Sequence, residues 1–582
     1  MLNNIKKSKI KAFFDQRITY FLIAVTFGYS LYYFNYFETP SADYVGNFMP
    51  RVFDYLQGNF PGFNFKILPL YPLLLSFLTP FNRTQLFDPI YSTALYLNII
   101  LFIPYLFLTY RIYTHFLSEK MSRLALLFLS FNGYTVYMVI NAELEMLLSF
   151  LIVLTFYCIL NKSSASYLIS FFVGITKWDS VFIIPAAMIS DFFFRKKRFL
   201  ALLGGCFASL GLIAWILMSM ILPPQIHNPY IGEISRRVPN IYLFIMDILF
   251  VATGFVQWAG SYLYNNFSSW IFISPLYLLL LIILILTFFL IILGIRKLIL
   301  NRTSDALALL TFFCGFILIH SIYQNSKTRY FVPILWLVNF LIFYAFEKDI
   351  LPFIKKKLNN VTFQNSWSKP IILLTSGLLL LVYLSSFIPF VFENKSIIII
   401  FALSFTAIGS YLIIPGRDIA SRKSMIIIVV LIGILINLQC YFCINMMDHY
   451  SLRRVEFKDV ALWFKENSTA DDILLISESN IPKYYTGFPQ KRFFETKLLK
   501  SKDYKSLPDE LSTKNINFIF IDNFYIERLK VGDKNSFYRK ADILKDLRDN
   551  FKFDKRYSIE KIFTYSEQQK SYLLRFSSSN RQ

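Results

Sequence analysis

The chain has 582 residues, of which 55% are hydrophobic and only 16% are charged, and its mean hydropathy is +0.49. Soluble domains average about 25% charged residues, so this composition excludes a soluble enzyme, a disordered regulator and a disulfide-stapled secreted domain. The net charge of +22 does not indicate a nucleic-acid partner, because most of the excess lies in short basic clusters between apolar runs. The sequence predicts a polytopic membrane protein.

The first apolar run covers residues 18–37 and follows a basic N-terminal segment. No small-residue cleavage site comes after it, so we interpret it as an uncleaved first helix with a cytoplasmic N-terminus. Further runs bring the prediction to about 13 crossings. They fall near residues 90–110, 124–140, 146–160, 165–176, 180–194, 199–222, 272–295, 305–322, 330–346, 370–391, 396–414 and 425–444.

The basic residues support one orientation of this topology. With the N-terminus inside, 24 of the 33 basic residues in positions 1–447 fall in cytoplasmic segments, as the positive-inside rule requires. The segment 241–258 is apolar enough to be another span, which would invert every later loop, and we interpret it as an interfacial helix. Two external loops, 38–89 and 223–270, are long, and long structured loops usually carry function.

After residue 447 the charged residues become frequent and the apolar runs shorten. This change predicts a transmembrane domain over 1–447 and a small extracytoplasmic α/β domain over 448–582. Helices are expected at 457–467 and 541–550, and strands at 472–477, 517–522, 557–565 and 571–576. The α/β domain shows no nucleotide-binding fingerprint and no nucleophile motif.

Ionisable residues at membrane depth are costly and usually functional, and few occur here. They are Asp43 after the first helix, Lys66 in the first external loop, Glu143 and Glu145 at the start of the fourth helix, Lys177 with Asp179 between residues 167 and 194, and Arg329 at the start of the tenth helix. The predicted topology brings all of them to the external membrane face. Carboxylates beside cations suit the transfer of a sugar from a lipid phosphate, since a carboxylate can deprotonate an acceptor hydroxyl while cations stabilise the departing phosphate.

The order of these groups resembles the GT-C superfamily of lipid-phosphate-sugar-dependent glycosyltransferases, which includes protein O-mannosyltransferases and lipid A aminoarabinose transferases. The likeness covers nearly the whole chain, including the external C-terminal domain. It implies that Asp43 is the catalytic base and that Glu143 or Glu145 is the second acidic residue of the site. It also implies that the donor phosphate contacts the basic residues, which are Lys66, Arg329 and Lys177.

Simpler interpretations of the same residues remain open. The three acids would cap helices or complement a helix dipole, and Arg329 would anchor a helix end at the interface. Lys177 and Asp179 would neutralise each other, which requires a helix break because residues two apart do not share a helix face. A divalent cation is not favoured, since two carboxylates without further oxygen ligands make a poor site, so no cofactor is expected.

We therefore predict a glycosyltransferase that moves a sugar, with inversion, from a polyprenyl-phosphate donor to a hydroxyl acceptor on a protein, lipid or glycan. The composition, rich in Lys, Asn, Ile and Phe, indicates a bacterial inner membrane. The alternatives are a transporter or flippase of lipid-linked sugars, a membrane anchor with a sensing domain, and a polysaccharide polymerase. Transporters usually show related halves and helices broken by Gly or Pro, whereas this chain has no evident halves and only 20 glycines.

Overall fold

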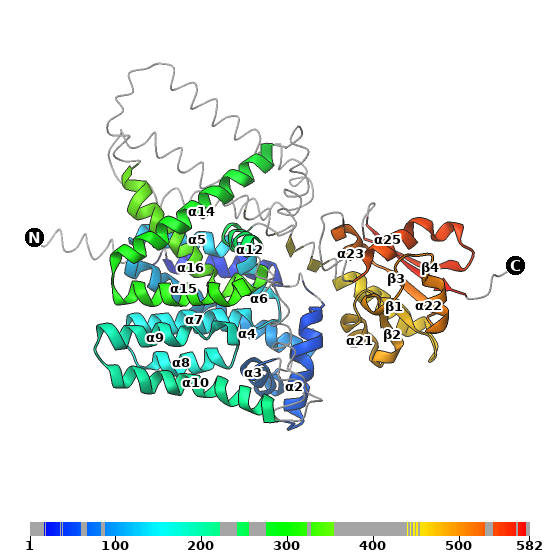
Figure 1. Ribbon diagram of the computed structural model, residues 1–582, viewed down its shortest axis with the longest axis horizontal. Coiled ribbons are helices and arrows are strands. Elements are labelled where there is room, and N and C mark those ends of the chain that lie inside the picture. The colour runs from blue at the N-terminus through cyan, green and yellow to red at the C-terminus, as the bar shows by residue number, and fades with distance from the viewer. Residues whose placement is uncertain are drawn as a thin grey trace, which may run out of the picture.

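The computed structural model divides the described residues into a helical membrane part and a smaller domain beside it (Figure 1). The described residues are 17, 19–34, 37, 39–59, 67–82, 88–221, 241–254, 275–322, 328–353, 439, 443, 446–447, 450–451, 454–529, 539–565 and 569–577. The spans expected at 370–391, 396–414 and nearly all of 425–444 lie outside them. The count of 13 crossings therefore stays a prediction.

The membrane part is built almost entirely of helices. After the helix Thr19–Tyr32 it contains η2 (Tyr44–Phe48), α2 (Met49–Leu56), α3 (Leu70–Leu78), η3 (Thr79–Phe81), α4 (Pro89–Phe116), α5 (Glu119–Phe131), α6 (Gly133–Ile140), α7 (Glu145–Leu160), α8 (Ala165–Gly174), η4 (Trp178–Ser180), α9 (Ile183–Ile189), η5 (Ser190–Phe194), α10 (Arg198–Ile221), α12 (Ile241–Thr253), α14 (Pro275–Asn301), α15 (Ser304–Ile322), η7 (Thr328–Ile334), α16 (Leu335–Ala345) and η8 (Phe346–Ile350). In Figure 1, α7 to α10 and α15 lie side by side as a stack.

Five of the described helices are long and apolar enough to cross a membrane. They are α4, most of α10 and α14, α15, and the continuous helix Arg329–Phe353, which includes α16. A sixth span results if α5 and α6 are counted together. These helices coincide with runs expected from the sequence and agree with a polytopic membrane architecture.

The run expected at 124–140 is two helices rather than one. α5 and α6 meet at Asn132 with a bend of 61°. The Asn132 side chain accepts a hydrogen bond from the backbone N–H of Tyr134 at 3.0 Å, which starts α6 as an N-cap does. Its amide nitrogen donates to the carbonyl oxygen of Val251 in α12 at 2.7 Å. A side chain with both of these partners in the interior fixes the bend.

A glycine in α14 permits close contact with α16. A Cβ atom added at Gly294 would lie about 2.4 Å from the carbonyl oxygen of Leu341, so only glycine fits. α16 is also fixed from α4, because the Tyr113 hydroxyl donates to the carbonyl oxygen of Trp336 at 2.7 Å. α16 is therefore held in the centre of the membrane part, directly after the segment that carries Arg329.

The C-terminal domain is a five-stranded mixed sheet in the order β2-β1-β3-β5-β4. The strands are β1 (Leu474–Ile476), β2 (Phe493–Glu495), β3 (Phe518–Ile521), β4 (Tyr557–Thr564) and β5 (Lys570–Phe576). β2, β1 and β3 are parallel, and β5 is antiparallel to β3 and β4. A helix over 454–467, α21 (Asn480–Thr486), α22 (Leu507–Thr513), α23 (Asn523–Leu529) and α25 (Ala541–Asn550) complete the domain.

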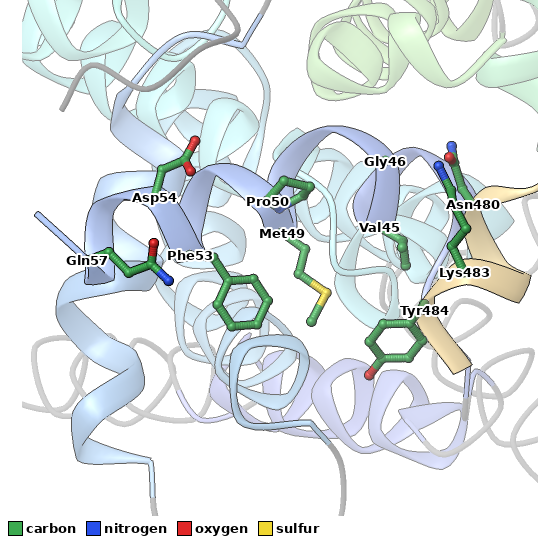
Figure 2. Close-up of a pocket in the computed structure, with 10 residues that line it drawn as sticks. All are labelled: Val45, Gly46, Met49, Pro50, Phe53, Asp54, Gln57, Asn480, Lys483 and Tyr484. Carbon is green, nitrogen blue, oxygen red and sulfur yellow. The ribbon is translucent and has the colours of Figure 1, made fainter. Parts of the chain in front are cut away.

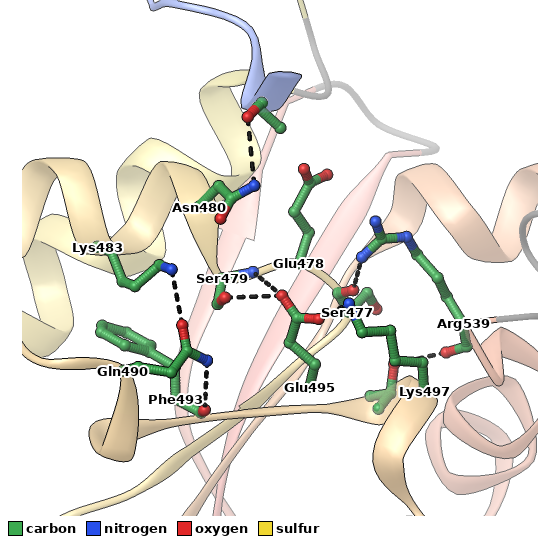
Figure 3. Close-up of polar contacts among 12 residues, drawn as sticks. Ser477, Glu478, Ser479, Asn480, Lys483, Gln490, Phe493, Glu495, Lys497 and Arg539 are labelled. Carbon is green, nitrogen blue, oxygen red and sulfur yellow. Dashed lines mark hydrogen bonds and ion pairs between the residues drawn. The ribbon is translucent and has the colours of Figure 1, made fainter. Parts of the chain in front are cut away.

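The carboxyl ends of the parallel strands carry a network of buried polar groups (Figure 3). Glu495 at the end of β2 accepts hydrogen bonds from the backbone and hydroxyl of Ser479, at 3.1 and 2.7 Å. Arg539 donates to the carbonyl oxygen of Ser477, which follows β1. Asn480, the residue after Ser479, donates to the carbonyl oxygen of Ala42 in the membrane part at 3.3 Å. This edge of the sheet therefore joins the two parts of the molecule.

Candidate active site

The segment after the first helix places Asp43 at the centre of the candidate site. Ser41, not Asp43, caps the turn that follows, because its hydroxyl oxygen accepts a hydrogen bond from the backbone N–H of Tyr44 at 3.1 Å. The Asp43 side chain makes no capping hydrogen bond to η2. Asp43 therefore occupies the N-cap position of η2 without capping it through its side chain.

Arg329 joins two carboxylates that lie far apart in the sequence. Its Nη2 atom is 2.5 Å from Asp43 Oδ2, and its Nη1 atom is 2.7 Å from Glu143 Oε2. The other oxygen of Glu143 accepts from the hydroxyl of Ser41 at 2.7 Å. Arg329 is thus more than an interfacial anchor, since it links the segment after the first helix to the residues just before α7.

Glu145 is the first residue of α7 and is buried. Its Oε2 atom has no hydrogen-bond partner among the described residues. It lies within electrostatic range of Glu143, Arg329 and Lys177. An unsatisfied buried oxygen within electrostatic range of these charged groups suggests a site for a polar group, because buried polar atoms in folded proteins are usually hydrogen-bonded.

Lys177 reaches the site through a break between helices. α8 ends at Gly174, and Lys177 has an extended backbone before η4. Its ammonium group is 3.0 Å from Asp179, whose same oxygen is 3.2 Å from Nε2 of His320 in α15. The mutual neutralisation that the sequence left open therefore occurs, with the helix break that it requires.

Lys177 and Arg329 both lie near the ring of Tyr330. The Lys177 Nζ atom lies 4.6 Å from the centre of the Tyr330 ring, and the Arg329 Cζ atom lies 5.3 Å from the same centre. Lys177 Nζ and Arg329 Nε are both buried without an aligned hydrogen bond to any described residue. Both cations are already paired with carboxylates. The donors that they leave without an aligned acceptor lie beside one aromatic ring, where an anion such as phosphate can bind.

The C-terminal domain completes the site through Arg454. Its guanidinium donates to the carbonyl oxygen of Thr39 at 2.9 Å and to Asn141 Oδ1 at 2.7 Å, and it lies 3.9 Å from the centre of the Phe37 ring. Thr39 also contacts the hydroxyl of Tyr485 at 3.0 Å. Both segments that carry the site carboxylates are therefore held by the same side chain.

A cavity of about 530 Å³ opens between residues 45–57 and α21. Figure 2 shows Phe53, Asp54 and Gln57 of the α2 region at one end and the α21 side chains at the other. Its remaining lining residues are Val45, Gly46, Met49, Pro50, Asn480, Lys483 and Tyr484. Val45 and Gly46 lie two and three residues after Asp43, so the cavity is lined by the segment that carries this carboxylate.

The structure brings together most of the site residues expected from the sequence. Asp43, Glu143 and Arg329 are in direct contact, and Glu145 and Lys177 lie around them. Lys66 lies outside the described residues. No group of three or more His, Cys, Asp and Glu side chains in the described part of the chain is arranged to hold a metal ion.

Four contributors were not identified from the sequence as site residues. They are Ser41, His320, its partner Asp179, and Arg454. Ser41 and His320 have no sequence signal beyond their positions near Asp43 and near the end of an apolar run. Arg454 lies at the start of the C-terminal domain, where charged residues are frequent and none was singled out.

No protein-family model and no curated protein matches this chain. Among solved structures, ArnT from Cupriavidus metallidurans bound to undecaprenyl phosphate is 11% identical, with a TM-score of 0.49 over 96% of this chain and 98% of that one. AglB is an oligosaccharyltransferase from Archaeoglobus fulgidus, solved in complex with an inhibitory peptide and a dolichol-phosphate. It is 9% identical, with a TM-score of 0.46 over 98% of this chain and 74% of that one. Both belong to the GT-C superfamily that the sequence motifs resemble. The function proposed below rests on the contacts of the site itself.

Proposed function

We propose that the chain is a membrane glycosyltransferase that moves a sugar from a polyprenyl-phosphate-linked donor to a hydroxyl acceptor at the extracytoplasmic face of a bacterial inner membrane. The observation that carries the proposal is the contact of one guanidinium with two carboxylates, beside a second cation with unused donors. This arrangement offers a base and an anion site in one place. The proposed orientation has the N-terminus in the cytoplasm and the C-terminal domain outside.

The donor phosphate is assigned to Lys177 and Arg329. Both have buried nitrogen atoms without an aligned hydrogen bond to any described residue, Nζ in Lys177 and Nε in Arg329. Charge-assisted hydrogen bonds from such groups to a phosphate are short and about twice as strong as neutral ones. Apolar surfaces of the surrounding helices leave the polyprenyl chain in the lipid, so a soluble nucleotide site is not needed. Lys66 is retained as a third phosphate contact on the family resemblance alone.

The base is assigned to Asp43, whose side chain is 38% exposed, against 3% for Glu143. A base must reach the proton that it removes, and of these two carboxylates only Asp43 is open to an incoming hydroxyl. Glu143 and Glu145 are assigned to orientation of the acceptor and of Arg329.

The reaction is a single displacement at the anomeric carbon. Asp43 takes the proton from the acceptor hydroxyl as the acceptor oxygen bonds to that carbon. The bond from the carbon to the phosphate oxygen breaks, and its electron pair leaves with the lipid phosphate. Arg329 and Lys177 stabilise the extra negative charge of this leaving group. Attack opposite to the leaving group inverts the anomeric configuration.

The acceptor is assigned to the cavity between the α2 region and α21. Its lining combines aromatic rings, amides and one residue of each charge, for example Tyr484, Gln57, Asp54 and Lys483. Such a surface can hold a polar acceptor without large net charge. The acceptor class stays open among protein, lipid and glycan.

Transfer of labelled sugar by the purified protein tests the proposal. A panel of polyprenyl-phosphate sugars is offered to the wild type, to Asp43→Asn and to Asp546→Asn, a matched control at an exposed position of α25. We expect wild-type transfer with an inverted product anomer, a fall of about 10²–10⁴-fold in kcat for Asp43→Asn, and little change in kcat for Asp546→Asn. Movement of lipid-linked sugar across reconstituted vesicles without transfer would support the flippase alternative instead.

A further inference from the structure

Arg329 is shared unequally by its two carboxylates. Glu143 is buried and has a second partner, since Ser41 donates to its other oxygen at 2.7 Å. Ser41 is itself fixed by the backbone N–H of Tyr44. The contact of Arg329 with Asp43 is the more exposed of the two, with the Asp43 side chain 38% exposed. An incoming anion therefore reaches the Asp43 contact first.

Of the two nitrogen atoms Nε and Nη2 on one side of the Arg329 guanidinium, only Nη2 contacts Asp43. Nε and Nη2 point to the same side of an arginine and together match two oxygens of a phosphate. In Arg329 the Nη2 atom contacts Asp43, whereas the buried Nε atom has no partner among the described residues. A phosphate that uses both nitrogen atoms competes with the Asp43 carboxylate for Nη2, and Nη1 can meanwhile stay on Glu143.

We infer that Arg329 keeps Asp43 from acting as a base until the lipid phosphate of the donor displaces it, an inference that rests on the proposed function. A carboxylate paired with a guanidinium accepts a proton less readily than one without such a partner, because the pairing favours the charged form. Binding of the phosphate thus supplies the leaving-group site and releases the base in one step. The donor binds first, and the acceptor is activated only afterwards.

Ser41 and Glu143 are positioning residues in this scheme. Glu143 holds Nη1 of Arg329 while Nη2 changes partner, and Ser41 holds Glu143. Loss of either should leave Arg329 poorly placed for the phosphate. Loss of the Asp43 charge should have the opposite effect, because it removes the group that competes with the phosphate.

Binding of polyprenyl phosphate without a sugar tests the inference in purified full-length protein in nanodiscs. The same lipid as the free alcohol reports any general damage to lipid binding. For Asp43→Asn we expect phosphate binding about tenfold tighter than in the wild type, as loss of one competing charge-assisted contact implies. Glu143→Gln and Ser41→Ala should weaken phosphate binding and leave binding of the alcohol unchanged.

Simple repulsion between carboxylates and phosphate makes a different prediction, namely that Asp43→Asn and Glu143→Gln both tighten binding. Equal gains in the two variants would therefore overturn the inference. Asp54→Asn removes a carboxylate of α2 that is not one of the two ion-pair partners of Arg329, and it should leave phosphate binding unchanged. A gain like that of Asp43→Asn would also count against a specific contact.

Arg329→Gln separates the inference from the proposed function. If this variant loses its preference for phosphate over alcohol while Asp43→Asn binds like the wild type, the phosphate site stands and the inference is wrong. If Arg329→Gln keeps the wild-type preference, the phosphate site itself is misassigned, and the inference fails with it.

Discussion

Replacement of Arg454 by methionine should lower kcat, although Arg454 contacts neither of the site carboxylates directly. Methionine keeps an unbranched side chain of similar length but removes the two hydrogen bonds to Thr39 and Asn141. Both acceptors are buried or nearly so. Hydrogen bonds to a charged group contribute about 1.5–3 kcal/mol each. The free energy that holds the C-terminal domain to the site segments is therefore smaller in the variant by roughly 3–6 kcal/mol.

This loss acts on both carboxylates at once. Thr39 lies four residues before Asp43, and Asn141 lies two residues before Glu143. A shift of about 1 Å in a reacting group can cost about 100-fold in rate. We therefore expect kcat for sugar transfer to fall about 100-fold, while the affinity for polyprenyl phosphate changes less.

Two measurements check this expectation, namely transfer kinetics and hydrogen exchange of the amides in β1 and β3. Exchange in those strands should stay slow in Arg454→Met, because the core of the domain does not depend on Arg454. The matched control is Arg492→Met, which removes a buried arginine that donates to the carbonyl oxygen of Asp472 inside the domain. It should speed exchange and leave kcat nearly unchanged. Wild-type kcat in Arg454→Met would refute the reasoning.

Two further predictions concern single charges. Lys177→Gln should weaken polyprenyl-phosphate binding about tenfold without affecting the free alcohol, whereas Lys483→Gln in the cavity should not; equal losses in the two would contradict the assignment of Lys177. In the C-terminal domain, burial and the neighbouring Asp522 raise the pKa of Glu456 well above its usual value of 4.5. The folded domain then holds a proton that the unfolded chain releases, so its free energy of unfolding falls as the pH rises from 4.5 toward the raised pKa. Glu456→Gln should remove this fall, which hydrogen exchange in full-length protein at pH 5 and pH 8 would measure; an equal gain at both values would contradict it.

The sequence predicted the elements that are set by local pattern. Apolar runs located α4, α10, α14 and α15, and short runs of strand-forming residues located β1, β3, β4 and β5. β2 was missed because its two phenylalanines lie between charged residues and form no apolar run of strand length. The bend at Asn132 was missed because it depends on a hydrogen bond to Val251, which is 119 positions away.

The site was predictable in its members but not in their contacts. Charge asymmetry between loops was enough to place Asp43, Glu143 and Arg329 on one face, since orientation follows from basic residues. That one guanidinium contacts both acids depends on how η7 packs against α7, and no local pattern encodes this. The roles of Ser41 and Arg454 depend on tertiary contacts in the same way, because a serine near a turn and an arginine in a charged helix are common.

The arrangement of the site has a consequence for biosynthesis. Asp43 and Glu143 are made early, whereas Arg329 follows 186 residues after Glu143 and Arg454 later still. A nascent chain that has inserted only its first helices carries the two carboxylates without the guanidinium that neutralises them. Buried charges without a partner are costly, and the contacts that join the Asp43 segment to Glu143 through Arg329 form only after Arg329 has been made. A chain truncated before residue 329 therefore carries no assembled candidate site.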